Sequence, residues 1–162
     1  MLTQPIHDKL HALRLRGMAE AFREQQESAD LQRLSFEERF GLLIDRQWNW
    51  RTSRALDRRL RNARLQGPAS IEDIDYRTPR GLDRQLVRSL VQESAWVREH
   101  QNLFLLGPTG IGKTWLARAF AQKACRAGYT ALCVKATELA RLLGTARADG
   151  SHAKVLAQLS RL

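Results

Sequence analysis

One segment of the sequence has the residue types and spacing of a phosphate-binding loop. Residues 107–114 are Gly-Pro-Thr-Gly-Ile-Gly-Lys-Thr and match the pattern G-x-x-x-x-G-K-[ST] at every defined position. Glycines let the backbone turn so that consecutive amides point at phosphate oxygens, and the helix that follows adds the positive end of its dipole. A plain glycine-rich turn has no need of a lysine and a threonine directly after its last glycine. The pattern therefore predicts nucleotide binding.

Two side chains of this loop bring chemistry of their own. We expect the Lys113 ammonium to neutralise the β- and γ-phosphates of ATP, and the Thr114 hydroxyl to be a ligand of Mg²⁺. ATP and Mg²⁺ are thus the predicted cofactors, with Thr114 as the metal ligand through Mg-ATP. The predicted cofactor-binding residues are Gly107, Pro108, Thr109, Gly110, Ile111, Gly112, Lys113 and Thr114.

A run of arginines, interrupted by a single acid, occupies residues 46–64. Four of them are spaced three, four and three residues apart and therefore share one face of a helix. Arginine forks grip phosphate oxygens, so this face is predicted to contact duplex DNA. A merely solvated basic face is the alternative. The predicted DNA-binding residues are Arg51, Arg54, Arg58 and Arg61.

The composition agrees with a polyanionic partner. Of 162 residues, 27 are lysine or arginine and 17 are acidic, which gives a formal charge of +10, and 43% are hydrophobic, enough for a core. A basic protein without such a partner is the alternative. Cys125 and Cys133 are expected to be reduced, mostly buried thiols. No signal peptide or membrane-spanning run is visible, so a cytoplasmic location is expected.

The first part of the chain has a helical pattern from about residue 6 to residue 65, and Gly17 is expected to mark a break. Apolar positions such as Ile6, Leu13 and Trp48 are predicted to lie in the core. Ser35 and Glu38 form a capping box, which predicts a long helix from this point. Residues 66–68, Gln-Gly-Pro, end it and set the predicted domain boundary.

Around the phosphate loop the pattern changes to that of an α/β fold. Residues 102–107 form an apolar run closed by glycine, which predicts a buried parallel strand over 103–106. A helix over 113–127 ending at Gly128, a second strand over 130–134 and a helix over 138–143 capped by Thr137 are predicted next. A helical tail over 151–162 follows. The predicted fold is an α/β P-loop NTPase fragment preceded by an all-α domain.

Three regions follow from these patterns. Residues 1–66 form the predicted helical DNA-binding domain, residues 67–101 lead into the ATPase part, and residues 102–162 form the N-terminal part of the nucleotide-binding domain. His7 and His11 stand four residues apart, but without a third ligand they predict no metal site.

The chain also resembles a known family. Residues 102–117, preceded by Arg80-Gly81-Leu82-Asp83, resemble the IstB-like ATP-binding proteins of insertion sequences, which are relatives of the helicase loader DnaC. Residues 9–19 resemble the N-terminal helical domain of the same family. The resemblance implies an AAA+ ATPase that binds double-stranded DNA, assembles into homo-oligomers with ATP and directs a partner transposase to its target.

One departure from that family bears on catalysis. The Walker B element, an apolar strand ending in acidic residues, is expected shortly after Leu162, and Glu138 and Asp149 are the only acids after Thr114. Neither follows an apolar strand, so no catalytic residue is assigned, and we expect this chain alone to bind ATP without hydrolysing it. In the sheet order that the resemblance implies, the two predicted strands are not neighbours. Residues from 103 onward are therefore expected to be poorly ordered.

The sequence allows two alternative functions. One is a non-catalytic DNA-binding or oligomer-capping module with a vestigial P-loop. The other is a small-molecule P-loop kinase, which is disfavoured because nothing after Thr114 resembles a substrate lid and because the charge is strongly basic.

Overall fold

The computed structural model describes residues 3–78 and 80–161. The chain forms two compact units, residues 1–57 and residues 58–162, which are described separately below. Within the described ranges the regular elements are all helices, and no strand is formed. Residues 1–2 and 79 of the predicted regions, and Leu162 of the predicted tail, lie outside the described residues.

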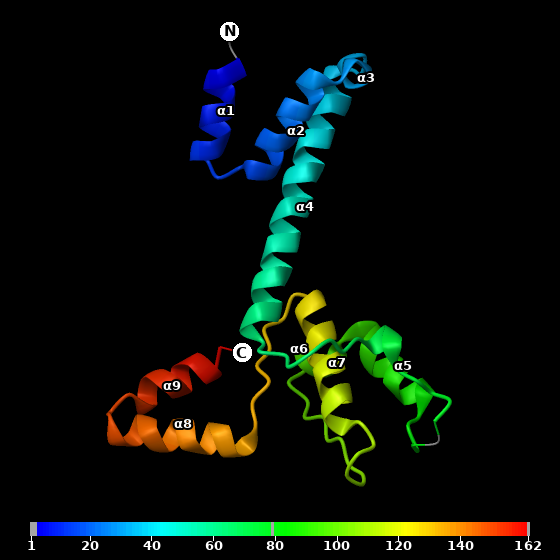
Figure 1. The fold of residues 1–162 in the computed structure, drawn as a ribbon, viewed down its shortest axis with the longest axis vertical. Helices are drawn as coiled ribbons and strands as arrows, with labels where there is room; N and C mark the ends of the chain where they lie inside the picture. The colour runs from blue at the N-terminus through cyan, green and yellow to red at the C-terminus, as the bar shows by residue number, and fades with distance from the viewer. Residues whose placement is uncertain (1–2, 79, 162) are drawn as a thin grey trace. The chain divides into compact units, whose positions relative to one another are not determined.

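The first unit is built from α1 (Thr3–Ala12), α2 (Arg16–Glu27), the short α3 (Ala29–Gln32) and most of α4 (Phe36–Asn62). In Figure 1, α2 lies alongside the N-terminal part of α4, which is drawn in cyan. Helix α4 begins as predicted, because the capping box is formed. The Ser35 amide donates to the Glu38 carboxylate at 2.8 Å, and the Glu38 amide donates to the Ser35 hydroxyl at 3.2 Å.

Gly17 does not break a helix, so this prediction was wrong. It lies inside α2, and the break falls at Arg14, whose φ of 60° ends α1. The glycine is needed for packing, because a Cβ at this position would lie 2.7 Å from the Trp50 Cβ and 2.9 Å from the Arg46 carbonyl oxygen. Helix α2 therefore approaches α4 more closely than any side chain would allow.

Small and amide side chains, rather than large apolar ones, hold these two helices together. Ala19 and Ala21 are buried. The Gln47 side chain accepts from the Met18 amide at 3.1 Å, and the Gln25 side chain donates to the Arg39 carbonyl at 2.8 Å. The expected core positions Ile6, Leu13 and Trp48 are instead 42%, 66% and 71% exposed, so the prediction that they lie in the core was wrong.

The second unit contains η1 (Ile71–Asp73), α5 (Arg84–Glu93), α6 (Ala95–Arg98), α7 (Lys113–Arg126), α8 (Ala136–Ala148) and α9 (His152–Leu159). Its core gathers on α7, where Ala119, Phe120, Ala124 and Cys125 are buried. The Trp96 ring meets the Phe120 ring edge-on at 6.1 Å. In Figure 1, α8 and α9 lie side by side.

The two predicted strands are not formed. Residues 102–107 and 130–134 are extended but belong to no ladder in the described part of the chain. A strand exists only where its backbone groups pair with a neighbouring strand, and these two segments were not expected to be neighbours. The predicted α/β sheet is therefore absent from the described residues, although the helices around it are present.

The helix predictions in this unit had mixed outcomes. Helix α7 ends as predicted at Gly128, whose φ is 103° and whose amide bonds to the Cys125 carbonyl. Helix α8 starts earlier than predicted, so Thr137 lies inside it and does not cap it. The tail helix is confirmed as α9. Both cysteines are free, Cys125 is buried, and burial raises the pKa of its thiol.

In the described part of the chain, no helix combines the length and the apolar character that crossing a membrane requires.

Candidate functional site

Glycines hold the phosphate loop in a conformation that other residues rarely adopt. The φ angles of Gly107, Gly110 and Gly112 are 146°, 89° and 93°. A Cβ on Gly107 would also lie 2.5 Å from the Ile111 Cδ1 atom. Pro108 and the other loop residues up to Gly110 are exposed, so the loop stands open to a ligand. The conformation therefore depends on the glycines that define the sequence pattern.

The loop presents backbone donors that have no protein partner. In the described residues, the amides of Gly110, Gly112, Lys113 and Thr114 donate no hydrogen bond. The last two belong to the first turn of α7, a helix of 14 residues whose N-terminus has no side-chain cap. Free amides at a helix N-terminus, joined to the positive end of the helix dipole, suit a phosphate group.

The Lys113 side chain is folded over the loop. Its ammonium donates to the Gly107 carbonyl at 2.9 Å and to the Pro108 carbonyl at 2.6 Å. The Lys113 N–H groups that donate to these carbonyl oxygens would donate to phosphate oxygens instead when a nucleotide binds. Thr114 is exposed, and its hydroxyl forms no hydrogen bond within the described ranges. All eight predicted nucleotide-binding residues thus fall in one loop and the start of one helix.

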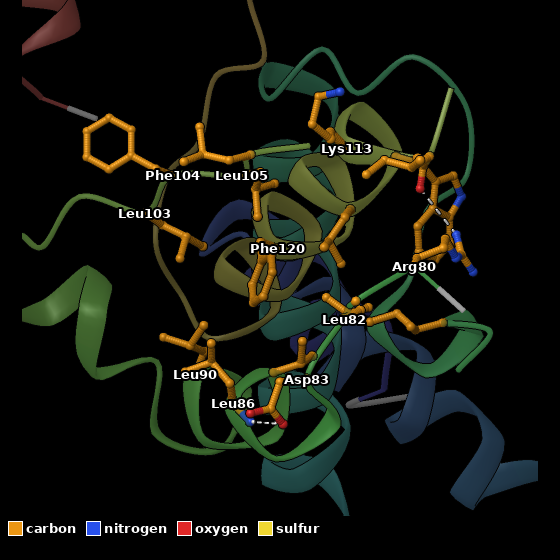
Figure 2. Close-up of a pocket in the computed structure, with 18 residues that line it drawn as sticks. Arg80, Leu82, Asp83, Leu86, Leu90, Leu103, Phe104, Leu105, Lys113 and Phe120 are labelled. Atoms are coloured by element: carbon orange, nitrogen blue, oxygen red, sulfur yellow. Dashed lines mark hydrogen bonds between the residues drawn. The ribbon is translucent and has the colours of Figure 1, made fainter. Parts of the chain in front are cut away.

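A pocket of about 250 Å³ adjoins the loop. Its walls come from α5, from the extended segment over 103–106 and from the face of α7 next to Lys113. Figure 2 shows Leu103 and Phe120 turned into this space and Phe104 turned away from it. Most of the lining is aliphatic or aromatic. The pocket therefore offers an apolar surface beside the phosphate-binding donors, as small-molecule sites commonly do.

Arg80 connects the preceding segment to the loop, a role that the sequence pattern did not reveal. One of its guanidinium nitrogens donates to the Asp75 carbonyl at 2.7 Å, and the other lies 3.5 Å from the Ile111 carbonyl (Figure 2). Its Nε atom is buried without a partner. The sequence held one signal for this role: Arg80 belongs to residues 80–83, which lie before α5 and carry part of the family resemblance.

The carboxylate among the lining residues is already engaged. Asp83 caps α5 by accepting from the Gln85 amide at 2.7 Å and the Leu86 amide at 3.2 Å. Ile74, from the segment before α5, also lines the pocket. Tyr76 instead packs under the Arg84 guanidinium, which lies 5.3 Å from its ring centroid. Among the described lining residues, the one carboxylate, Asp83, thus uses its Oδ1 atom to cap α5.

The four predicted DNA-binding arginines all lie on α4. Each is exposed, and none forms an ion pair within the described residues. Their spacing keeps them within about a quarter of the helix circumference. The Arg54 guanidinium lies 5.3 Å from the centroid of the Trp50 ring. Arg59, which is not on this face, has a structural task, since its Nε donates to the Cys125 carbonyl at 2.8 Å.

Groups of three or more metal-binding side chains are absent from the described part of the chain. The His7 and His11 rings lie 4.5 Å apart and contact one another.

Comparison with known proteins identifies the family. Residues 8–162 match the profile of a family described as IstB-like ATP binding protein. The chain belongs to this family. Its resemblance to IstB-like proteins, first seen in the P-loop and its flanks, is therefore confirmed over nearly the whole sequence.

Relatives from several bacteria match the same stretch. A candidate ATP-binding protein of insertion sequence IS1162 from Pseudomonas fluorescens is 44% identical over all of this chain and 70% of its own length. The candidate insertion sequence ATP-binding protein y4pL of Sinorhizobium fredii is 43% identical over 96% of this chain and 63% of its own. A candidate ATP-binding protein of insertion sequence IS21 from Pseudomonas aeruginosa is 33% identical over 83% of this chain and half of its own length. The chain thus spans between 50% and 70% of the length of these relatives.

Proposed function

We propose that this IstB-like chain binds ATP with Mg²⁺ at the loop of residues 107–114. The observation that carries the proposal is the set of free amides over Gly110, Gly112, Lys113 and Thr114, held open by glycines with positive φ. Phosphate oxygens would accept from these amides and from the Lys113 ammonium. The adjoining apolar pocket would receive the rest of the nucleotide.

The residues present also fit a magnesium ion. The exposed Thr114 hydroxyl on the first turn of α7 is of the oxygen-ligand type that Mg²⁺ uses. The bound ion would neutralise phosphate charge. The chain's own task is then to orient the phosphates through the loop amides and to keep Lys113 beside them.

Calorimetric titration of the chain with Mg-ATP tests this proposal. Lys113→Ala should weaken binding by at least about tenfold, since a charge-assisted hydrogen bond contributes about 1.5–3 kcal/mol. Lys154→Ala is the matched control, because it removes the same charge from an exposed position on α9. Equal affinities of the wild type and Lys113→Ala would refute the proposal. Equal losses in both variants would show that only net charge matters.

We further propose that the chain binds duplex DNA and acts with a transposase as a helper of insertion-sequence transposition, in homo-oligomers formed with ATP. The net charge of +10 and the unpaired arginines of α4 support the DNA contact. The names of the relatives, which refer to insertion sequences, support the transposition context.

A salt series of anisotropy titrations with labelled duplex tests the DNA contact. Each phosphate neutralised contributes about 0.9 to the slope of log affinity against log salt. Joint replacement of Arg51, Arg54, Arg58 and Arg61 by alanine should therefore flatten the slope. An unchanged slope would place the contact elsewhere on the chain.

We also propose that the nucleotide-binding part is of the α/β AAA+ class. Residues 103–106 support this, because Leu103 and Leu105 are half-buried while Phe104 and Leu106 are 78% and 86% exposed. Alternation of this kind is the side-chain pattern of a strand. The two exposed side chains would then face a further layer of the completed fold.

A second candidate function is a non-catalytic module that binds DNA or caps oligomers. One observation favours it over an active ATPase. Asp83, the carboxylate among the described pocket-lining residues, uses its Oδ1 atom to cap α5. Phosphate release measured against Lys113→Ala distinguishes the two, since a non-catalytic module releases phosphate no faster than that variant.

A further inference from the structure

The first unit contains a basic hollow that the predicted arginine face does not describe. It has a volume of about 590 Å³ and is open to solvent. Two separate stretches of the chain form it. The turn between α1 and α2 contributes His11, Arg14 and Arg16, and α4 contributes Trp50 and Arg51.

The charge of this hollow is not compensated by the protein. The side chains of Arg14, Arg16 and Arg51 are exposed and form no hydrogen bond or ion pair within the described residues. Helix α2 starts at Arg16 without a side-chain cap, which adds the positive end of a helix dipole to the same place. Three guanidinium groups and a helix N-terminus thus lie around the hollow, and this concentration of positive charge favours the binding of an anion.

Arg14 holds its position at a cost in backbone strain. Its φ is 60°, and the turn is closed by bonds from the Arg14 amide to the His11 carbonyl at 2.9 Å and from the Leu15 amide to the Leu10 carbonyl at 2.8 Å. This is the helix ending at which glycine is the preferred residue. A side chain at this position destabilises the turn, so the arginine has no local structural advantage over glycine.

We propose that this hollow binds a backbone phosphate of duplex DNA, with Arg14, Arg16 and Arg51 as the gripping residues and the Trp50 ring as an apolar wall. The inference rests on the proposed DNA binding and adds a second element to it. Nucleic acid fits better than a small anion, because the hollow is open and Arg54 continues the positive surface along α4. The contact surface then includes the α1–α2 turn as well as one face of α4.

The strained turn allows a test in which binding and stability move in opposite directions. Arg14→Gly should leave the melting temperature of the full chain unchanged or raise it, because glycine tolerates this φ. The same variant should bind a labelled duplex about tenfold more weakly and lower the salt slope by about one. Arg33→Ala is the control for net charge, because Arg33 is exposed and paired with Asp30 at 3.6 Å on the same unit. It should bind within about twofold of the wild type.

A footprint of the wild-type chain gives a second readout that needs no variant. Phenylglyoxal modification of Arg14, Arg16 and Arg51 should be slowed by duplex DNA, while modification of Arg33 should not. Poly-glutamate serves as the competing polyanion. If it protects these arginines and DNA does not, the hollow binds an acidic protein segment and the proposal is wrong.

The remaining outcomes separate the two proposals. If the wild type binds duplex but Arg14→Gly and Arg33→Ala bind equally well, the hollow is not a contact and only this inference fails. If the wild type binds no duplex at all, the proposed DNA binding fails and this inference fails with it.

Discussion

The helices of the first unit and the phosphate-loop segment of the second leave different groups without partners. In the first unit the backbone groups of α2 and α4 are hydrogen-bonded within the helices, and the groups without partners are the charged side chains of the exposed arginines around the basic hollow. Residues 102–107 differ in both respects. Backbone groups have no ladder, and the large apolar side chains Phe104 and Leu106 are exposed.

This difference indicates how each region meets its ligand. The hydrogen bonds between α2 and α4 join residues 14 to 29 positions apart, but each of the two helices is itself formed by local backbone hydrogen bonds. The phosphate loop also takes its shape locally, from glycines and the start of α7. Its flanking segments need distant partners before they become strands. The loop is therefore formed while its surroundings are not.

The largest effect expected from this comparison is in hydrogen exchange. Amides in the middle of α2, such as those of Ala19 and Ala21, should exchange at least about a thousandfold more slowly than those of Phe104 and Leu106. The reason is that the helical amides are bonded and buried while the extended segment has no ladder. Exchange followed by mass spectrometry on the full chain measures both regions at once.

Strong protection over residues 103–106 in the isolated chain would break the comparison. It would mean that this segment pairs with a strand from another molecule. Addition of Mg-ATP sharpens the test, because protection that appears only over 110–114 would report phosphate binding without sheet formation.

Next in size is the effect of filling the close approach between α2 and α4. Gly17→Ala should destabilise the first unit by about 1–3 kcal/mol, because the new Cβ meets the backbone of Arg46 and Gln47 as well as Trp50. Gly41→Ala, on α4 of the same unit, is the matched control, since nothing lies within 4 Å of its Cβ position. It should stabilise by about 0.5–1 kcal/mol. Thermal melts of the two variants should shift in opposite directions.

The sequence predicted what depends on neighbours in the chain. The capping box at Ser35, the end of α7 at Gly128 and the left-handed glycines of the phosphate loop all follow from local residue chemistry. The close packing of Gly17 against Trp50 was not predicted, because a glycine in a helical pattern resembles a break. The predicted strands failed for a related reason, since apolar runs show that a segment can pair but not what pairs with it.

The basic hollow shows the same limit within the site. Arg51 was predicted as a DNA contact from its helical spacing. Arg14 and Arg16 were missed because they lie on another element and come near Trp50 only in the folded unit. Their signal in the sequence was slight, two arginines flanking one leucine before Gly17.

A smaller effect should follow from removal of the cap of α4. Ser35→Ala removes the hydroxyl that accepts from the Glu38 amide and should destabilise the first unit by about 1 kcal/mol. Ser53→Ala, in the middle of the same helix, is the control and should be neutral or slightly stabilising because alanine is the better helix former. Equal effects of the two substitutions in a urea titration would show that the capping box contributes nothing.

The smallest effect concerns an exposed ion pair that joins η1 to α7 in the second unit. The Arg126 guanidinium lies 2.7 Å from the Glu72 carboxylate, and both side chains are about half exposed. A hydrogen bond from the Ser70 hydroxyl, more than Arg126 itself, lowers the pKa of Glu72 from 4.5 to about 2.

Because the pKa of Glu72 is lowered on folding, its ionised form stabilises the folded state, fully above pH 4.5 and progressively less as the pH falls toward about 2. Glu72→Gln should therefore lower the melting temperature slightly at neutral pH and much less near pH 2. Solvent screening limits the loss to no more than about 1 kcal/mol. Glu20→Gln is the control, because Glu20 is an exposed carboxylate without a hydrogen bond or ion pair in the described residues. A Glu72→Gln deficit that persists unchanged near pH 2 would mean that the glutamate acts through packing rather than through its charge. A deficit as large as that of Gly17→Ala would mean that the second unit depends on its surface contacts as strongly as the first depends on close helix packing.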